Sequence, residues 1–151
     1  SAAAVERALG AEVASSSAYD SGDKAPVTGE VKDVAHEFSC TFQADDGTAA
    51  RAWVFAPPVP RDQARALVAA TESADGCERV PDAPAFGRPS AATECQQKGR
   101  TTLTFRGLFG DAWLSCSVAI PAATATGAAQ PDLADRAGRW CTEVVRAAGP
   151  A

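Results

Sequence analysis

The residue type with the most chemical potential in this chain is cysteine, which occurs five times at wide intervals. The positions are Cys40, Cys77, Cys95, Cys116 and Cys141. No two of them have the CxxC spacing of a redox motif or a zinc-binding pair. Widely spaced cysteines in a chain of this size are typical of disulfide bonds formed in an oxidising compartment. The spacing therefore predicts disulfides rather than thiol catalysis or metal binding.

The other candidate catalytic groups do not combine into a site. His36 is the only histidine, and the chain has no Gly-x-Ser-x-Gly motif to supply a nucleophile beside it. Asp45 and Asp46 fall in a turn sequence, where aspartate is favoured for turn geometry alone. There is also no glycine-rich loop at a strand-to-helix junction that would hold a phosphate. We therefore expect a protein without enzymatic activity and without a metal or other cofactor.

Composition indicates one small domain with a thin hydrophobic core. The chain has 151 residues, the usual size of one domain, but Leu, Ile, Val and Phe make up only about a sixth of it. Alanine supplies much of the remaining apolar content and buries little area per residue. The net charge of −5 argues against binding to nucleic acid or to anionic membrane surfaces. The sequence contains no apolar run long enough to predict a transmembrane segment.

The N-terminal half predicts a helix, a loop, a hairpin and a second helix. Residues 2–9 have helical spacing and are followed by a glycine, whereas residues 14–32 are polar and aperiodic and predict a loop. Residues 38–42 and 51–56 alternate as strands on either side of an Asp-Asp-Gly turn. Residues 60–72 then follow a helical period that begins at a proline.

The C-terminal half predicts the same order of elements after a proline-rich loop at residues 78–99. Residues 102–106 and 113–120 alternate as a second hairpin, and residues 131–148 form an amphipathic helix. The two hairpin–helix units resemble a weak internal duplication. We therefore expect a single α+β domain over residues 1–151. Its core would be a four-stranded antiparallel sheet with helices packed on one face, plus the short N-terminal helix.

Two disulfides follow from these elements. Cys116 falls on the apolar face of a strand and Cys141 on the apolar face of the last helix, so a bond between them would join the helix to the sheet. A Cys77–Cys95 bond would close the proline-rich loop. Cys40 is then left as a free, buried thiol. The alternatives are that Cys40 is reactive or forms an intermolecular disulfide, and that the cysteines pair in another of the connectivities their number allows.

One group of side chains indicates a ligand-binding surface. Arg51 and Trp53 project from one hairpin, and Arg106 and Trp113 project from the other, on the face opposite the cysteines. If the hairpins are neighbours, these four side chains line one surface of the sheet, and arginine and tryptophan are favoured in binding sites. Alternatively, the N-terminal helix or the proline-rich loop covers this face, and the tryptophans belong to a second small core.

The order of motifs resembles two groups of actinobacterial proteins. A short helix ending in Leu9-Gly10, the Phe-x-Cys-x-Phe strand at 38–42, a tryptophan-bearing strand and the Trp140-Cys141 helix are similar to secreted envelope lipoproteins of unassigned function. The same order resembles the extracytoplasmic sensor domains of some mycobacterial receptor kinases, which are small disulfide-braced α+β domains. An arginine-rich composition without asparagine is typical of such GC-rich genomes. The resemblance carries over no catalytic residues.

These observations favour a non-catalytic extracytoplasmic domain, secreted or anchored to the cell envelope, that binds a small molecule, a glycan or a protein partner. The alternative is a structural or assembly subunit of an envelope complex. A secreted hydrolase is less favoured, as is a protease inhibitor presenting the proline-rich loop. If the chain is tethered to a membrane, we expect the tether in a segment upstream of Ser1.

Overall fold

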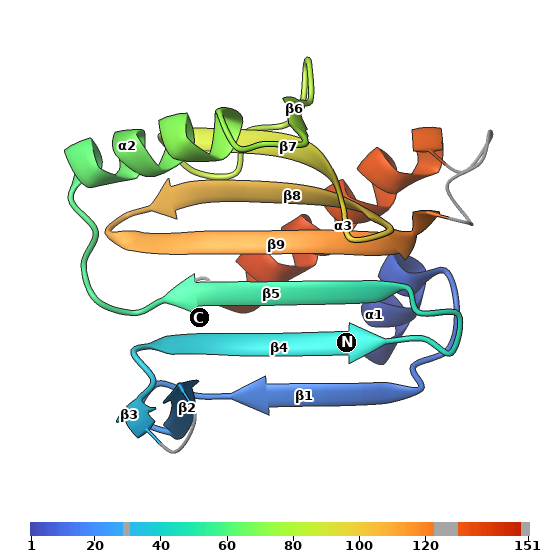
Figure 1. The fold of residues 1–151 in the computed structure, drawn as a ribbon, viewed down its shortest axis with the longest axis horizontal. Coiled ribbons are helices and arrows are strands. Elements are labelled where there is room, and N and C mark those ends of the chain that lie inside the picture. Colours follow the sequence, from blue (N-terminus) through green and yellow to red (C-terminus); the bar gives the residue numbers. More distant parts are fainter. Residues whose placement is uncertain (29–30, 123–129, 149–151) are drawn as a thin grey trace.

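The computed structural model describes residues 1–28, 31–122 and 130–148, and shows an α+β fold, as the sequence predicts (Figure 1). The helices are α1 (Ala2–Leu9), α2 (Arg61–Glu72) and α3 (Gln130–Ala148). The strands are β1 (Ser15–Tyr19), β2 (Lys24–Thr28), β3 (Val31–Val34), β4 (Glu37–Gln43), β5 (Ala49–Phe55), β6 (Cys77–Arg79), β7 (Ser90–Gln97), β8 (Arg100–Phe109) and β9 (Ala112–Pro121).

The main sheet is wider than the sequence predicts. It has seven antiparallel strands in the order β1-β4-β5-β9-β8-β7-β6, and β2 and β3 pair as a separate ribbon. The predicted four-stranded sheet is therefore wrong in extent. The four predicted strands do form its centre, where the two hairpins join through β5 and β9, with Arg51 opposite Ser117 and Trp53 opposite Ser115. The additional strands lie at the two edges.

The edge strands were missed because their sequences carry no apolar alternation. β1 has the sequence Ser-Ser-Ser-Ala-Tyr and is almost wholly exposed, so burial imposes no pattern on it. It falls within residues 14–32, for which the sequence predicts a loop, so that prediction is wrong here. β6 and β7 occupy much of residues 78–99, the expected proline-rich loop, and β7 buries alanine and threonine rather than large side chains. Small buried residues give a weak periodic signal.

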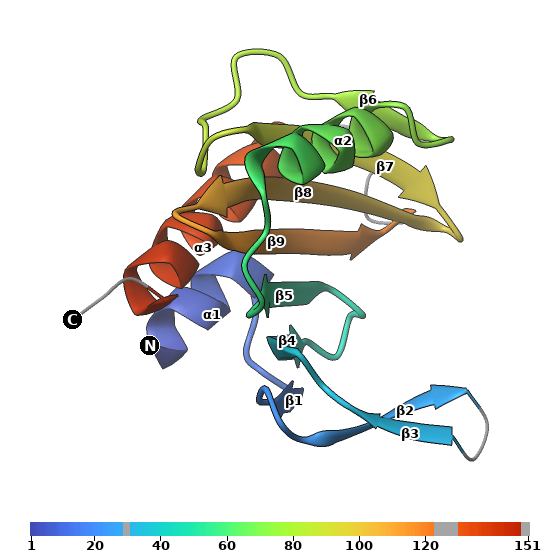
Figure 2. The ribbon, with the colours of Figure 1, turned by 90° about the vertical axis from the view of Figure 1, so that its left-hand side faces the viewer.

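The helices pack on both faces of the sheet, which corrects the expectation of a single helical face. α1 and α3 lie together on one face, and α2 lies on the other (Figure 2). We call these the α3 face and the α2 face. The α2 face has its own small core, in which Ala64 of α2 packs near Leu108 and Trp113 of the sheet. The larger core lies on the α3 face and includes Leu103, Phe105 and Val118.

The C-terminal helix is fixed to the sheet by a buried disulfide. The structure contains the bond Cys116–Cys141 between β9 and α3, the pair expected from the sequence, with a Cα–Cα distance of 5.5 Å. Both cysteines are at most 1 % exposed. α3 also holds α1, because the Arg136 side chain donates hydrogen bonds to the carbonyl oxygens of Ala8 and Leu9 at the end of α1. Sheet, α3 and α1 therefore form one connected unit.

The second disulfide, Cys77–Cys95, joins directly opposite residues of β6 and β7. It is also a pair expected from the sequence. The chain between these strands returns across β8, where Phe86 packs edge-on against Phe105 with ring centroids 5.0 Å apart. Gly107 of β8 allows this approach, since a Cβ there would lie 1.7 Å from the carbonyl oxygen of Phe86. The two disulfides are consistent with an oxidising compartment.

The close approach of the Phe86 segment to Gly107 predicts that two glycine-to-alanine substitutions have opposite effects on the free energy of unfolding. We expect Gly107→Ala to lower the free energy of unfolding by about 1–3 kcal/mol, because backbone atoms must move to admit the Cβ. Gly138 of α3 has open space around it, so Gly138→Ala should raise the free energy of unfolding by about 0.5–1 kcal/mol through helix propensity. Urea denaturation of both variants measures this. Equal stability of the two variants would contradict the described crossing.

Candidate functional site

A cleft opens on the α3 face because the helices cover only part of the sheet. α3 packs on β9, β8 and β5, whereas α1 packs on α3 and on β4 and β5. None of the three described helices lies over β1 and the neighbouring part of β4 in the same way (Figure 1). The space between this uncovered part of the sheet and the two helices has a volume of about 820 Å³.

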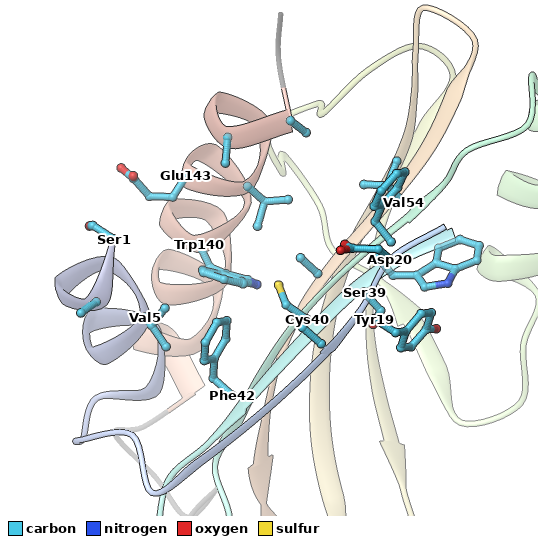
Figure 3. A pocket seen from close by; sticks show the side chains of 18 residues that line it. Ser1, Val5, Tyr19, Asp20, Ser39, Cys40, Phe42, Val54, Trp140 and Glu143 are labelled. Atoms are coloured by element: carbon cyan, nitrogen blue, oxygen red, sulfur yellow. The ribbon is translucent and has the colours of Figure 1, made fainter. Parts of the chain in front are cut away.

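The cleft is mostly apolar. Its residues come from α1, β1, β4, β5 and α3, as Figure 3 shows. The lining consists of Ser1, Ala2, Val5, Ala18, Tyr19, Asp20, Phe38, Ser39, Cys40, Phe42, Ala52, Trp53, Val54, Trp140, Glu143, Val144, Ala147 and Ala148. Tyr19, Ser39 and Trp53 share one register row and, by strand alternation, belong to the α2 face. They therefore contribute at the edge of the cleft rather than to its floor.

Two aromatic side chains form the inner wall of the cleft. Trp140 of α3 meets Phe42 of β4 edge-to-face, with ring centroids 6.0 Å apart. The indole Nε1 of Trp140 donates a hydrogen bond to the carbonyl oxygen of Arg51 at 2.9 Å, which fixes the ring against β5. Toward the opening, Phe38 is 46 % exposed, an unusual degree for phenylalanine. The sheet thus presents apolar surface that the helices do not cover.

Cys40 lines this cleft beside Phe42 (Figure 3). Phe38, two residues earlier on β4, is also a lining residue. Cys40 is a free thiol, as the sequence predicts, but it is half-buried rather than fully buried. Loss of solvent raises the pKa of the Cys40 thiol, and a backbone hydrogen bond from Ala52 opposes this in part. A thiol with a raised pKa is a poor nucleophile at neutral pH. We therefore interpret Cys40 as a residue that lines the cleft, not as a reactive group.

The opposite face gathers three of the four side chains expected to form a ligand surface. Arg51, Trp53 and Arg106 line one hollow there, together with hydroxyl residues of β8 and β9. Arg51 and Trp53 come from β5, and Arg106 comes from β8, two strands away in the sheet. The junction of the two hairpins through β5 and β9 is what brings them together.

Trp113 does not belong to that hollow. It is 4 % exposed and packs with Val59, Ala64 and Leu108 beneath α2. The sequence placed Trp113 on the correct face of the sheet but did not anticipate that α2 covers it. The alternative of a second small core therefore describes Trp113, with α2 as its cover rather than α1 or the proline-rich segment.

The remaining candidate groups form no constellation in the part of the chain that the structure describes. His36 is exposed, just before β4. Within the described ranges, no three His, Cys, Asp or Glu residues lie close enough together to bind a metal ion. None of the described helices combines the length and hydrophobicity needed to cross a membrane.

Comparison with known proteins adds no family to this description. The chain matches no protein-family model, and none of the curated proteins is similar enough to count as a match. The geometry of the two faces is therefore the basis for any functional conclusion.

The cleft itself was not anticipated from the sequence. The sequence predicts a strand over residues 38–42 with Cys40 buried, and an amphipathic helix over residues 131–148, but no open space between them. The feature of the sequence that could have indicated an open cleft is the number of predicted helices. Three helices divided between two faces cannot cover a wide sheet, so some apolar strand surface must stay open.

The state of Cys40 yields a testable expectation for its reactivity. Because its pKa is raised, less thiolate is present at a given pH, and alkylation by iodoacetamide should be slower than for glutathione across neutral pH. The midpoint of the rate–pH profile should also lie above that of glutathione. Mass spectrometry of timed aliquots measures both. A midpoint below that of glutathione would show an activated thiol and contradict a lining role.

Proposed function

We propose that this protein is a non-catalytic extracytoplasmic domain that binds an uncharged apolar small molecule in the cleft beside α3. The observation that carries this proposal is the cleft of about 820 Å³ whose lining includes Phe38, Cys40 and Phe42 of β4. Small-molecule sites are typically concave and mostly apolar, with volumes of about 300–1,000 Å³. The size and lining of the cleft both match this class of site.

The arrangement of the walls supports binding rather than simple underpacking. The Trp140 ring is held by its hydrogen bond to β5, so the wall is in place before a ligand arrives. Two carboxylates, those of Asp20 and Glu143, are among the lining residues of the cleft. Glu143 is ion-paired with Arg146, and Asp20 is exposed. An apolar molecule with a neutral polar end fits this distribution, whereas a fatty carboxylate would bring a second negative charge toward Asp20.

The extracytoplasmic location is part of the same proposal. The structure holds two disulfides, and such bonds persist in oxidising compartments such as the cell envelope and the exterior. The absence of enzymatic activity is likewise proposed, since the lining of the cleft offers no activated nucleophile or acid–base pair.

The alternative function, an assembly subunit of an envelope complex, is supported by the exposure of Phe38 and by the position of β1 as the outermost strand of the described sheet. An exposed aromatic side chain close to an edge strand is suited to contact with another protein. Sedimentation at increasing concentration and pull-down from envelope extract distinguish the two functions. A strictly monomeric protein that binds an apolar probe favours the ligand-binding domain.

A fluorescent probe tests the ligand-binding proposal directly. We expect the uncharged dye N-phenylnaphthylamine to bind saturably with increased fluorescence and to slow alkylation of Cys40. Ala147→Phe, which adds a ring to the wall of the cleft on α3, should weaken binding about tenfold or more by occupying the site. Ala70→Phe provides the matched control, because Ala70 is an exposed helical alanine on α2.

Two results would overturn this assignment. One is a dissociation constant that Ala147→Phe leaves unchanged, and the other is saturable binding that does not protect Cys40. Dodecanol and dodecanoate then test the ligand class by competition. The alcohol should displace the dye more effectively than the carboxylate.

A further inference from the structure

The hollow on the α2 face has the chemistry of an anion site. It has a volume of about 400 Å³, and we call it the polar groove. Its lining consists of Arg51, Trp53, Thr102, Thr104, Arg106, Ser115 and Ser117. Two arginines and four hydroxyl side chains therefore face the same space, beside one tryptophan. No carboxylate is among the lining residues.

The sheet register explains why this space is hollow. Arg51 lies opposite Ser117, which lies opposite Thr104 on the next strand. In the adjacent row, Trp53 lies opposite Ser115, and Ser115 lies opposite Arg106. The small serines of β9 thus form a floor between β5 and β8. Strands two apart are separated by about 10 Å, so the long arginine side chains can flank the serine floor from both sides.

Neither guanidinium has a counter-ion among the described residues. The ion pairs found there all involve other arginines, namely Arg79, Arg139 and Arg146. Arg106 is partly buried, and its hydrogen bond to a side chain goes to the neutral hydroxyl of Thr93 at 3.4 Å. Burial lowers the pKa of the Arg106 guanidinium, which nevertheless stays charged. A cation that has lost solvent without gaining an anion is energetically unsatisfied.

The hydroxyls of the groove are available to a ligand as well. Among the described residues, no hydrogen bond between protein groups involves the four hydroxyl side chains of the groove, which belong to Thr102, Thr104, Ser115 and Ser117. No buried side-chain nitrogen or oxygen in this part lacks a partner, so these hydroxyls are open to the groove rather than sealed in the sheet. Hydroxyl and guanidinium donors together are a common set for binding an oxyanion.

We propose that the polar groove binds an oxyanion group of a small molecule, carried as a phosphate or a carboxylate, between Arg51 and Arg106. Ser115 and Ser117 donate hydrogen bonds from the floor. Trp53 forms one wall, against which a ring of the same molecule stacks. An arginine guanidinium matches both oxyanions because its donors form a planar fork.

This groove is a second site, distinct from the apolar cleft. It lies on the face of the sheet opposite Cys40 and Phe42, with the backbone of β5 and β9 between the two. Trp53 stands at the boundary and contributes to the lining of both. The oxyanion site therefore does not rest on the proposed function, and either one can fail alone.

Isothermal titration at moderate ionic strength tests the groove with inorganic phosphate and with benzoate as probes. We expect saturable binding of at least one probe, and Arg106→Gln and Arg51→Gln should each weaken it about tenfold or more. Arg7→Gln is the control, because Arg7 is an exposed arginine of α1 and its loss changes the net charge equally. Circular dichroism and thermal melting confirm that the variants are folded.

The outcomes separate the two sources of the oxyanion. Preferential binding of phosphate identifies a phosphorylated ligand, and preferential binding of benzoate identifies an aromatic or cyclic carboxylate. Ala147→Phe should leave either affinity unchanged, since the apolar cleft is elsewhere. Binding of neither probe would overturn the proposal. Equal weakening by Arg7→Gln and Arg106→Gln would also overturn it, because it would show only a response to net charge.

Discussion

The attachment of α3 to β9 is the constraint from which the rest of the structure follows. The Cys116–Cys141 bond fixes the helix over the middle of the sheet, and the Trp140 hydrogen bond to the Arg51 carbonyl sets its rotation. α1 is then held against α3 through Arg136. With so few large aliphatic side chains in the sequence, a covalent bond supplies stability that packing alone would not, about 3 kcal/mol for a loop of this length. The helices cannot spread across the sheet, so β1 and part of β4 stay uncovered.

The two faces of the sheet consequently differ in character. The α3 face buries the main core and leaves an apolar cleft where its helices end. On the α2 face, the single helix covers Trp113 and Leu108, and the strands beyond it carry serine, threonine and arginine. One sheet thereby presents an apolar site and a cationic site back to back. A molecule with an apolar body and a molecule with an anionic group would meet different surfaces of the same rigid scaffold.

The elements that the sequence predicts correctly are those in which the burial of one face produces a clear hydrophobic period. The helices over residues 2–9 and 60–72, the four central strands and both cysteine pairs have clear periodic or positional signals. β1 has no such signal, because an exposed edge strand of serines obeys no alternation. The face of the sheet on which α2 packs cannot be predicted from the local sequence either, because it depends on the course of the connecting segment around Val59. For this reason the sequence groups Arg51, Trp53 and Arg106 on one face. It places Trp113 on the same face without predicting that α2 covers it, and it does not predict the cleft beside Phe38.

Nuclear magnetic resonance of the tryptophan indole groups tests the central claim most directly, because the three tryptophans mark three environments. Trp140 lines the apolar cleft, Trp53 stands at its edge and in the polar groove, and Trp113 is sealed beneath α2. During titration with N-phenylnaphthylamine, the Trp140 indole signal should shift saturably, with the same dissociation constant as the dye fluorescence, while Trp113 stays unchanged. A saturating fluorescence signal with an unmoved Trp140 resonance would contradict the claim that the apolar cleft beside α3 is a binding site.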